Sequence, residues 1–439
     1  MNKDDINTPN VTKQKQKGWL QRLKEESWEA ELLVSAIAIY GSFQLFGMID
    51  WATNTLIDVL DPSQYLAGYV IVFLGLFAIS ILTSMFVVHF FLRAYWIGLV
   101  GLNSVFPDYS IEDSAYSKIY TEKLLTILPK PEDSIKKVDE LCSVIFSVAF
   151  TFLLIYTYIA IFASVYLLLF NLLSSYVSSI ILLIPLAIFC LFIFCQMIVA
   201  LIANLKANKE KEKLQTLNFK VVKYGSILMY GPLYKAILQI MTLFGSNFKK
   251  KKSMVYLLFS FLIFGLLLTV YQMNKTNIPY LITTGMSLEA DATRVNSSYY
   301  ESENDNNTFL LTPEIKSDII KNEVVKIFIP IFDFEEDLRV NVCGNYIKDN
   351  NKSKVEQRKA RRLFLLNCYN TYNTVYLNDI KVDLSFLKYD HPRTNQFGVV
   401  GYVSTTGIKQ GMNQITVKKE YDESNITTWS IPFYYIKKY

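Results

Sequence analysis

The sequence predicts an integral membrane bundle of about five transmembrane α-helices followed by a C-terminal all-β sandwich, immunoglobulin-like or jelly-roll. Long uncharged apolar runs alternate with polar segments up to residue 273, and a run of about 18 residues is long enough to cross a bilayer. After residue 310 the pattern changes to short runs of β-branched and aromatic residues separated by Gly, Asn and Pro, which is typical of strands. The whole chain is 51% hydrophobic and only 19% charged, whereas soluble domains average about 25% charged residues.

Five apolar runs define the predicted membrane domain, residues 31–273. The spans cover about 32–50, 66–92, 144–170, 180–203 and 254–273. A polar tail, 1–30, precedes them, and the first run begins too far from Met1 to be a cleavable signal peptide. A polar linker, 274–310, connects the last span to the β domain, 311–439.

Lysine and arginine placement predicts the orientation, because positive residues are retained on the cytoplasmic side. The N-terminal tail and segments 93–142 and 204–253 each carry at least six Lys or Arg residues, whereas the connections 51–65 and 171–179 contain none. The alternation predicts a cytoplasmic N-terminus and an extracytoplasmic C-terminal domain. Abundant Lys, Asn, Ile and Tyr, with only 17 Gly and 12 Pro, indicate an AT-rich bacterial genome, hence the bacterial cytoplasmic (inner) membrane.

Segment 226–245 is the main alternative to this topology. It is amphipathic and interrupted by Gly231, Pro232 and Lys235, so we expect it to lie in the membrane interface. If it crossed instead, the count would be six and the C-terminal domain would be cytoplasmic. The four lysines at 249–252 would then face outward, which argues against a crossing.

His89 and Arg93 are the most unusual residues in the predicted spans, and their spacing places them on one helix face. One interpretation is a proton or ion path. The other is that Arg93 reaches the inner phosphate layer, with neutral His89 one turn deeper. We favour the second, because the stretch from Leu66 to Arg93 already covers the bilayer and the arginine needs no buried partner.

Other candidate residues in the spans are polar or small. Gln44 and Gln196 are polar side chains near the midplane. Ala38 and Ser42 form a small-x-x-x-small face next to Gly41, suited to close helix packing. That packing is either internal to one chain or between chains of an oligomer.

Two of the five cysteines fall in the predicted β domain. Cys343 and Cys368 lie in separate strand-like runs and form a possible disulfide, which an oxidising compartment would favour and which is worth about 3 kcal/mol for such a loop. The alternative is two buried thiols. Cys142, Cys190 and Cys195 are expected to behave as small buried apolar residues.

Motifs for chemistry are missing from the sequence. The two histidines, His89 and His391, fall on opposite sides of the predicted membrane and cannot share a metal. The carboxylates of DFEEDL, 333–338, are expected on a strand–turn that splits them between two faces. No P-loop or G-x-S-x-G motif is present. We therefore expect no catalytic residue, metal or cofactor, and, since the lysines flank membrane segments, no nucleic-acid partner.

The sequence predicts a non-enzymatic multi-pass membrane protein of unknown partner. Its outer β domain binds or scaffolds a protein, peptide or glycan, while the helices contact membrane lipids, anchor the chain and form a homo-oligomer or a complex. The alternative is a pore-forming or transport component with the β domain as an accessory cap. Five spans do not divide into the repeated halves common in transporters.

Overall fold

The computed structural model describes residues 28–106, 109, 115–174, 177–247, 252–283, 295–304, 309–349, 353–422 and 426–437. Two compact units are formed, Met1–Phe46 with Gly75–Val270, and Gly47–Leu74 with Tyr271–Tyr439. Most of the predicted N-terminal tail, much of the linker and three of the four clustered lysines lie outside the described residues.

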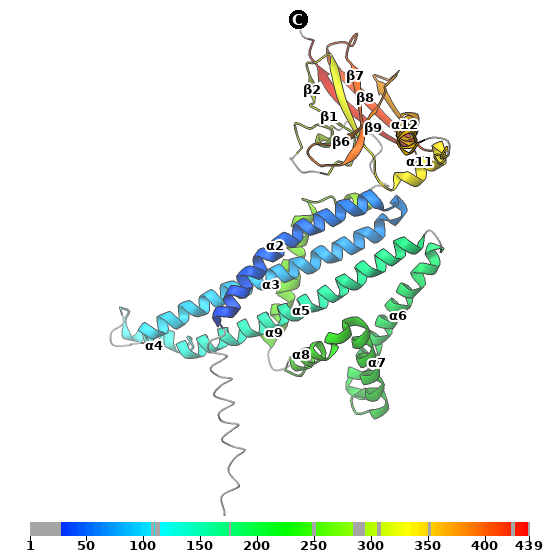
Figure 1. The fold of residues 1–439 in the computed structure, drawn as a ribbon. Helices are drawn as coiled ribbons and strands as arrows, with labels where there is room; N and C mark the ends of the chain where they lie inside the picture. The colour runs from blue at the N-terminus through cyan, green and yellow to red at the C-terminus, as the bar shows by residue number, and fades with distance from the viewer. Residues whose placement is uncertain are drawn as a thin grey trace, which may run out of the picture. The chain divides into compact units, whose positions relative to one another are not determined.

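The N-terminal part consists of long apolar helices, as predicted (Figure 1). Their bounds are α2 (Trp28–Val59), α3 (Tyr65–Val105), α4 (Lys118–Leu125), α5 (Pro131–Ser174), α6 (Ser179–Asn204), α7 (Glu212–Tyr230), α8 (Tyr234–Asn247) and α9 (Lys252–Met273), with short 3-10 turns η1 (Pro62–Gln64), η2 (Lys206–Asn208) and η3 (Gly231–Leu233). Within the described residues, six segments are long and apolar enough to cross a membrane, the five predicted ones and Glu212–Phe244. Their length and composition indicate a membrane protein.

The helical unit packs around the middle of α3. Its buried cluster combines residues of α3, α5 and α9: Ile81, Leu82, Met85, Phe86, Ile145, Ala149 and Phe261. Gly265 of α9 lies so close to Ile81 that a Cβ there would be 2.5 Å from its Cγ1. Leu257, two turns earlier, lines a small cavity with Met85. Residue numbers therefore rise along α9 as they fall along α3, so the two helices are antiparallel.

The segment from α7 to α8 is broken at Gly231, which has φ +50° and is followed by Pro232. Glycine adopts this left-handed conformation at little cost, and proline cannot donate the next helical hydrogen bond. The turn is closely packed, since a Cβ on Gly231 would lie 2.6 Å from the Tyr158 hydroxyl oxygen of α5.

The C-terminal part is rich in sheet, as predicted, and contains two sheets (Figure 1). One has the order β1-β3-β7-β6 and the other β2-β9-β8-β4-β5, and every pair is antiparallel except β2–β9. The bounds are β1 (Glu314–Ile315), β2 (Ile319–Ile320), β3 (Val324–Pro330), β4 (Asn373–Leu377), β5 (Ile380–Val382), β6 (Leu387–Asp390), β7 (Phe397–Ser404), β8 (Gly411–Glu420) and β9 (Ile426–Tyr435).

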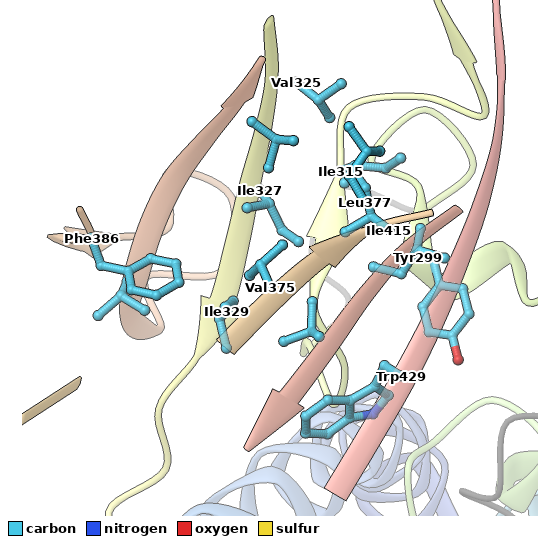
Figure 2. Packing of buried hydrophobic residues seen from close by; sticks show 14 of the residues in the cluster. Tyr299, Ile315, Val325, Ile327, Ile329, Val375, Leu377, Phe386, Ile415 and Trp429 are labelled. Carbon is cyan, nitrogen blue, oxygen red and sulfur yellow. The ribbon is translucent and has the colours of Figure 1, made fainter. Parts of the chain in front are cut away.

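Side chains from both sheets meet in one apolar core (Figure 2). Ile327 and Ile329 enter it from β3, and Val375 and Ile415 enter it from β4 and β8. Burial alternates along β4 and over the first four residues of β3, as the period of two along a strand predicts, and the rest of β3 is buried on both faces. The core also holds Trp429 of β9.

The prediction of an all-β domain is wrong, because helices α11 (Glu335–Cys343) and α12 (Lys354–Tyr372) lie between β3 and β4. Part of DFEEDL and the run LRVNVC, predicted as strand, form α11. Its first turn carries Glu335, Glu336 and Asp337, and acidic residues stabilise a helix N-terminus. A capping box between Ser353 and Glu356 begins α12.

The second unit also contains the α2–α3 turn and two further short elements, α10 (Tyr280–Thr283) and η5 (Ser297–Tyr299). The Asp58 carbonyl and carboxylate accept hydrogen bonds from the backbone N–H groups of Phe334 and Asp333, at 3.0 and 3.1 Å. The Tyr65 ring meets Phe334 edge-on, with centroids 6.4 Å apart. The end of the helical hairpin is thus part of the same compact unit as the two sheets.

Candidate functional site

Arg93 is the centre of a buried charged network in the helical unit. Its side chain is 1% exposed, and its two terminal nitrogens donate to Glu31 Oε2 at 2.6 Å and to Asp139 Oδ1 at 2.8 Å. The Trp96 ring lies 4.7 Å from the guanidinium carbon. Because Glu31 is on α2 and Asp139 on α5, this one side chain connects three helices.

His89 belongs to the same network, one turn away on α3. Its ring is fully buried, and its Nδ1 lies 2.7 Å from Ser35 Oγ of α2. Its Nε2 lies 3.8 Å from Glu31 Oε2, and its ring packs on Phe146 with centroids 5.2 Å apart.

The expectation that Arg93 needs no buried partner is therefore wrong. Its carboxylate partners are 62 and 46 positions away along the chain, so the pattern of α3 alone contained no sign of them. Burying a charge is costly unless it is paired and hydrogen-bonded, and here two carboxylates supply that pairing. The network joins α2, α3 and α5, and Glu31 Oε2 and Asp139 Oδ1 both bind Arg93.

The other intramembrane candidates are dispersed over the helical unit. Gln44 is exposed, and Gln196 lies against Gly225 of α7 without a hydrogen-bond partner for Oε1 among the described residues. Ser42 is buried and donates to the Ala38 carbonyl oxygen at 2.7 Å. Ala38 packs against the buried cluster.

Gly41 does not lie on the same packed side of α2 as Ala38 and Ser42. It is exposed, and no described atom lies within 4 Å of a Cβ built on it. Within the chain, Ala38 and Ser42 therefore lie on a packed side of α2, whereas Gly41 lies on its surface. Of the other cysteines, Cys142 is buried as expected, whereas Cys190 and Cys195 are exposed on the surface of α6, contrary to the expectation.

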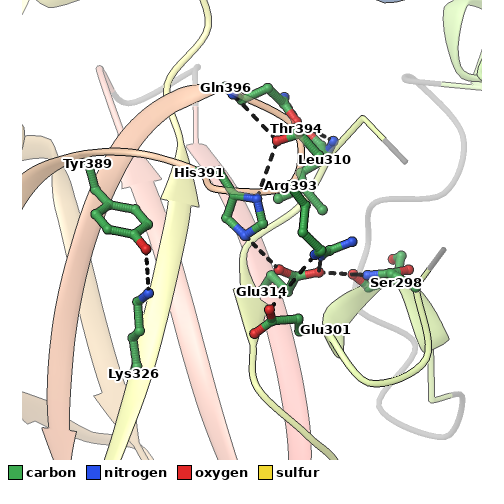
Figure 3. Close-up of polar contacts among 11 residues, drawn as sticks. Ser298, Glu301, Leu310, Glu314, Lys326, Tyr389, His391, Arg393, Thr394 and Gln396 are labelled. Carbon is green, nitrogen blue, oxygen red and sulfur yellow. Dashed lines mark hydrogen bonds and ion pairs between the residues drawn. The ribbon is translucent and has the colours of Figure 1, made fainter. Parts of the chain in front are cut away.

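His391 lies in a polar cluster of the sheet-containing unit (Figure 3). Its Nε2 is 3.2 Å from Glu314 Oε2, and Arg393 also pairs with Glu314. Burial lowers the pKa of His391, although the Glu314 carboxylate opposes that effect. Thr394 Oγ1 is 3.4 Å from His391 Nδ1, too long for a strong hydrogen bond. Because Arg393 shares the carboxylate, this arrangement is better suited to holding the loop than to activating a nucleophile.

The acidic residues of DFEEDL pair individually rather than acting together. Glu335 is buried and accepts a hydrogen bond from Lys419 Nζ at 2.6 Å, while Glu336 pairs with Arg339 at 3.1 Å. Burial lowers the pKa of Lys419, and Glu335 opposes that effect. This buried pair attaches the start of α11 to β8.

Cys343 and Cys368 form a disulfide in the structure, with Cα atoms 5.9 Å apart. The bond joins the end of α11 to the C-terminal part of α12 rather than two strands. It therefore fixes the two helices that sequence reasoning missed.

A basic pocket of about 400 Å³ lies between these two helices. Five of its lining residues are cationic and one is acidic: Arg339, Lys348, Lys354, Arg358, Arg361 and Glu336. The sequence contains a signal for this site in the basic stretch K-V-E-Q-R-K-A-R-R, 354–362. Its cations can be placed on one face only when the segment is recognised as a helix. The pocket is the feature of the described chain best suited to binding a ligand.

These features define a class, a chain with long apolar helices followed by a two-sheet domain that carries a basic pocket. Comparison with known proteins gives no match, whether with protein families, curated proteins or solved structures.

Proposed function

We propose that this protein is a non-enzymatic, multi-pass membrane protein whose C-terminal domain binds a partner. The apolar helices anchor the chain and contribute to an oligomer or complex. The observation that carries the proposal is the basic pocket between α11 and α12, which lies in the volume range of ligand sites. The proposal includes no cofactor and no nucleic acid.

Five crossings are supported by helix direction within the helical unit. Glu31 pairs with Arg93, and Ser35 with His89, so α2 is antiparallel to α3. Since α9 is also antiparallel to α3, α2 and α9 run the same way. In this proposal α3, α5 and α6 cross between them, and segment 212–247 begins and ends on one side of the membrane. The bend at Gly231 agrees with this interfacial course.

The proposed orientation follows from the basic segments, with Met1 in the cytoplasm and the C-terminal domain outside a bacterial inner membrane. A protease-cleavable tag after Tyr439 tests it in spheroplasts, in which the outer membrane is opened and the inner membrane is intact. We expect cleavage without permeabilisation, and a second tag before Met1 should be cleaved only after lysis. Protection of the C-terminal tag would overturn the orientation and favour six crossings.

The binding function is tested by purification in mild detergent, native mass measurement and identification of co-purifying molecules. We expect a discrete added mass that stays with the full-length protein. A variant with Lys348, Arg358 and Arg361 changed to Gln should lose it if the pocket is the binding site. A wild-type protein that carries no partner when taken from its native membrane would contradict the proposal.

The His89–Arg93 network is the one observation that favours a pore or transport component instead, because ionisable residues inside membrane segments often belong to ion paths. Against this, the nearby cavity measures only about 20 Å³ and is lined by apolar residues. Measuring proton and ion flux into liposomes that contain the protein distinguishes a transport component from a partner-binding protein. Flux that disappears in Arg93→Gln while the protein stays folded would favour the transport interpretation.

A further inference from the structure

The basic pocket is organised by one face of α12. Lys354, Arg358 and Arg361 are spaced by four and three residues, so they project from the same side of the helix. Arg339 of α11 lines the pocket with them, and Lys348 comes from the segment between the two helices. Cations from three consecutive parts of the chain therefore converge on one space.

The walls of the pocket are fixed to α12 at several points. The Cys343–Cys368 disulfide holds the end of α11. The Tyr346 ring packs at a tilt against Phe364 with ring centroids 5.8 Å apart, and Gln357 Nε2 donates to the Asp349 carbonyl oxygen at 2.9 Å. A pocket held in this way loses little conformational entropy when a ligand binds.

The charges in the pocket are poorly balanced by the protein. Glu336 lies 3.1 Å from Arg339. In the part of the chain that the structure describes, no carboxylate lies within 4.0 Å of Lys348, Lys354, Arg358 or Arg361. Like charges gathered in one concave site repel one another, so an anion in the pocket would lower its electrostatic energy.

The positive potential extends beyond the pocket itself. Burial lowers the pKa of Lys388 on β6, and the nearby guanidinium groups of Arg362, Arg339 and Arg361 lower it further. The neighbouring lysine thus responds to the same accumulation of positive charge.

We propose that the pocket between α11 and α12 binds the phosphate group of an anionic ligand. Arginine presents a planar fork of N–H donors that matches phosphate oxygens. A phosphate monoester carries about −1.5 to −2 charges at pH 7 and three acceptor oxygens, so it suits several converging cations better than a single carboxylate does. This inference rests on the proposed binding function and names the chemistry that the pocket recognises.

Two sources present this chemistry, soluble phosphorylated compounds and anionic lipid headgroups. The experiment uses the full-length protein in detergent and isothermal titration calorimetry. One arm titrates inorganic pyrophosphate. The other titrates monomeric short-chain phosphatidylglycerol, with short-chain phosphatidylcholine, whose headgroup is zwitterionic and has no net charge, as the comparison.

The chain offers a closely matched pair of variants. Arg358→Gln/Arg361→Gln removes two cations that line the pocket, and Lys359→Gln/Arg362→Gln removes two with the same spacing from the same helix, neither of which lines it. We expect the first to raise the Kd for the bound probe at least tenfold and the second to raise it less than threefold. Thermal unfolding of both variants confirms that they are folded.

The two titrations distinguish a soluble phosphorylated ligand from a lipid headgroup. Pocket-dependent binding of pyrophosphate indicates a soluble ligand, and pocket-dependent binding of phosphatidylglycerol alone indicates a lipid headgroup. Equal losses in the two variants, or no wild-type binding of either probe at millimolar concentration, would overturn the inference. A co-purifying partner that the Arg358→Gln/Arg361→Gln variant retains would leave the proposed function intact and reject only the phosphate site.

Discussion

Arg93 and Glu31 are 62 positions apart in the chain, yet Arg93 Nη2 lies 2.6 Å from Glu31 Oε2 in a part-buried contact between α3 and α2. Asp139 of α5 completes the coordination of the same guanidinium at 2.8 Å. A buried ion pair is not in itself strong evidence of net stabilisation, but removal of one partner leaves an uncompensated buried charge. This asymmetry gives the first prediction.

Arg93→Gln should destabilise the helical unit by about 3–5 kcal/mol, because the Glu31 and Asp139 carboxylates both lose their contact with the buried guanidinium. The measurement is thermal unfolding of the full-length protein in detergent. Adding Glu31→Gln and Asp139→Asn to Arg93→Gln should recover part of the loss, since the two carboxylates that the guanidinium neutralised are then neutral as well. A triple variant less stable than the single variant would contradict this account.

Gly265→Ala should separate α9 from α3. The new Cβ would lie 2.5 Å from Ile81 Cγ1 and 3.1 Å from Ile81 Cα, and overpacking of this kind costs about 1–3 kcal/mol. Gly101→Ala is the matched control, because no described atom lies within 4 Å of its Cβ position. There, alanine should stabilise the helix by up to about 1 kcal/mol. Thermal unfolding of both variants tests the contact, and equal stabilities would count against it.

The Cys343–Cys368 disulfide should be detected by peptide mass spectrometry of unreduced protein. With a sequence separation of 25 residues, its loss in Cys343→Ser/Cys368→Ser should cost about 3 kcal/mol on the chain-entropy account. The variant should also weaken ligand binding, because α11 would no longer be fixed to α12. Alkylation of either cysteine in protein purified without reductant would show that the bond is not formed.

His391 should make the stability of the sheet-containing unit depend on pH. Its folded-state pKa is lowered by burial from its ordinary 6.5, although Glu314 and Glu301 raise it and Arg393 and Lys326 lower it. Below about pH 6.5 the unfolded chain binds a proton that the folded one does not. Stability is therefore lost as pH falls from 6.5 through the folded pKa, by at most about 1.4 kcal/mol per pH unit.

The measurement is the thermal unfolding midpoint of wild type and His391→Gln at pH 7.5, 6.5 and 5.5. The wild type should lose more stability than the variant over the lower interval, because glutamine takes up no proton. Parallel pH profiles, or a wild type that gains stability on acidification, would show that His391 does not titrate in this way.

Hydropathy located the helices well but not their full length. The predicted spans 180–203 and 254–273 nearly coincide with α6 and α9, whereas α3 continues to Val105 and α5 begins at Pro131. An apolar run reports the part of a helix that avoids water, and the polar continuation of the same helix gives no such signal. The strands β3, β4, β7, β8 and β9 lie in the region after residue 310 where β-branched and aromatic residues predict strands, because that signal is also local.

The sequence by itself determined the long apolar helices and the change to strand-forming composition after residue 310, because both depend on local hydrophobic periodicity. The tertiary structure decided which carboxylates meet Arg93 and how Lys354, Arg358 and Arg361 come to share a pocket with Arg339. The partners of Arg93 are far from it in the chain. These residues of the pocket lie on α11 and α12, and strand-forming residues in these helices prevented their prediction. The energies of these contacts depend on neighbours supplied by packing, which no single stretch of sequence contains.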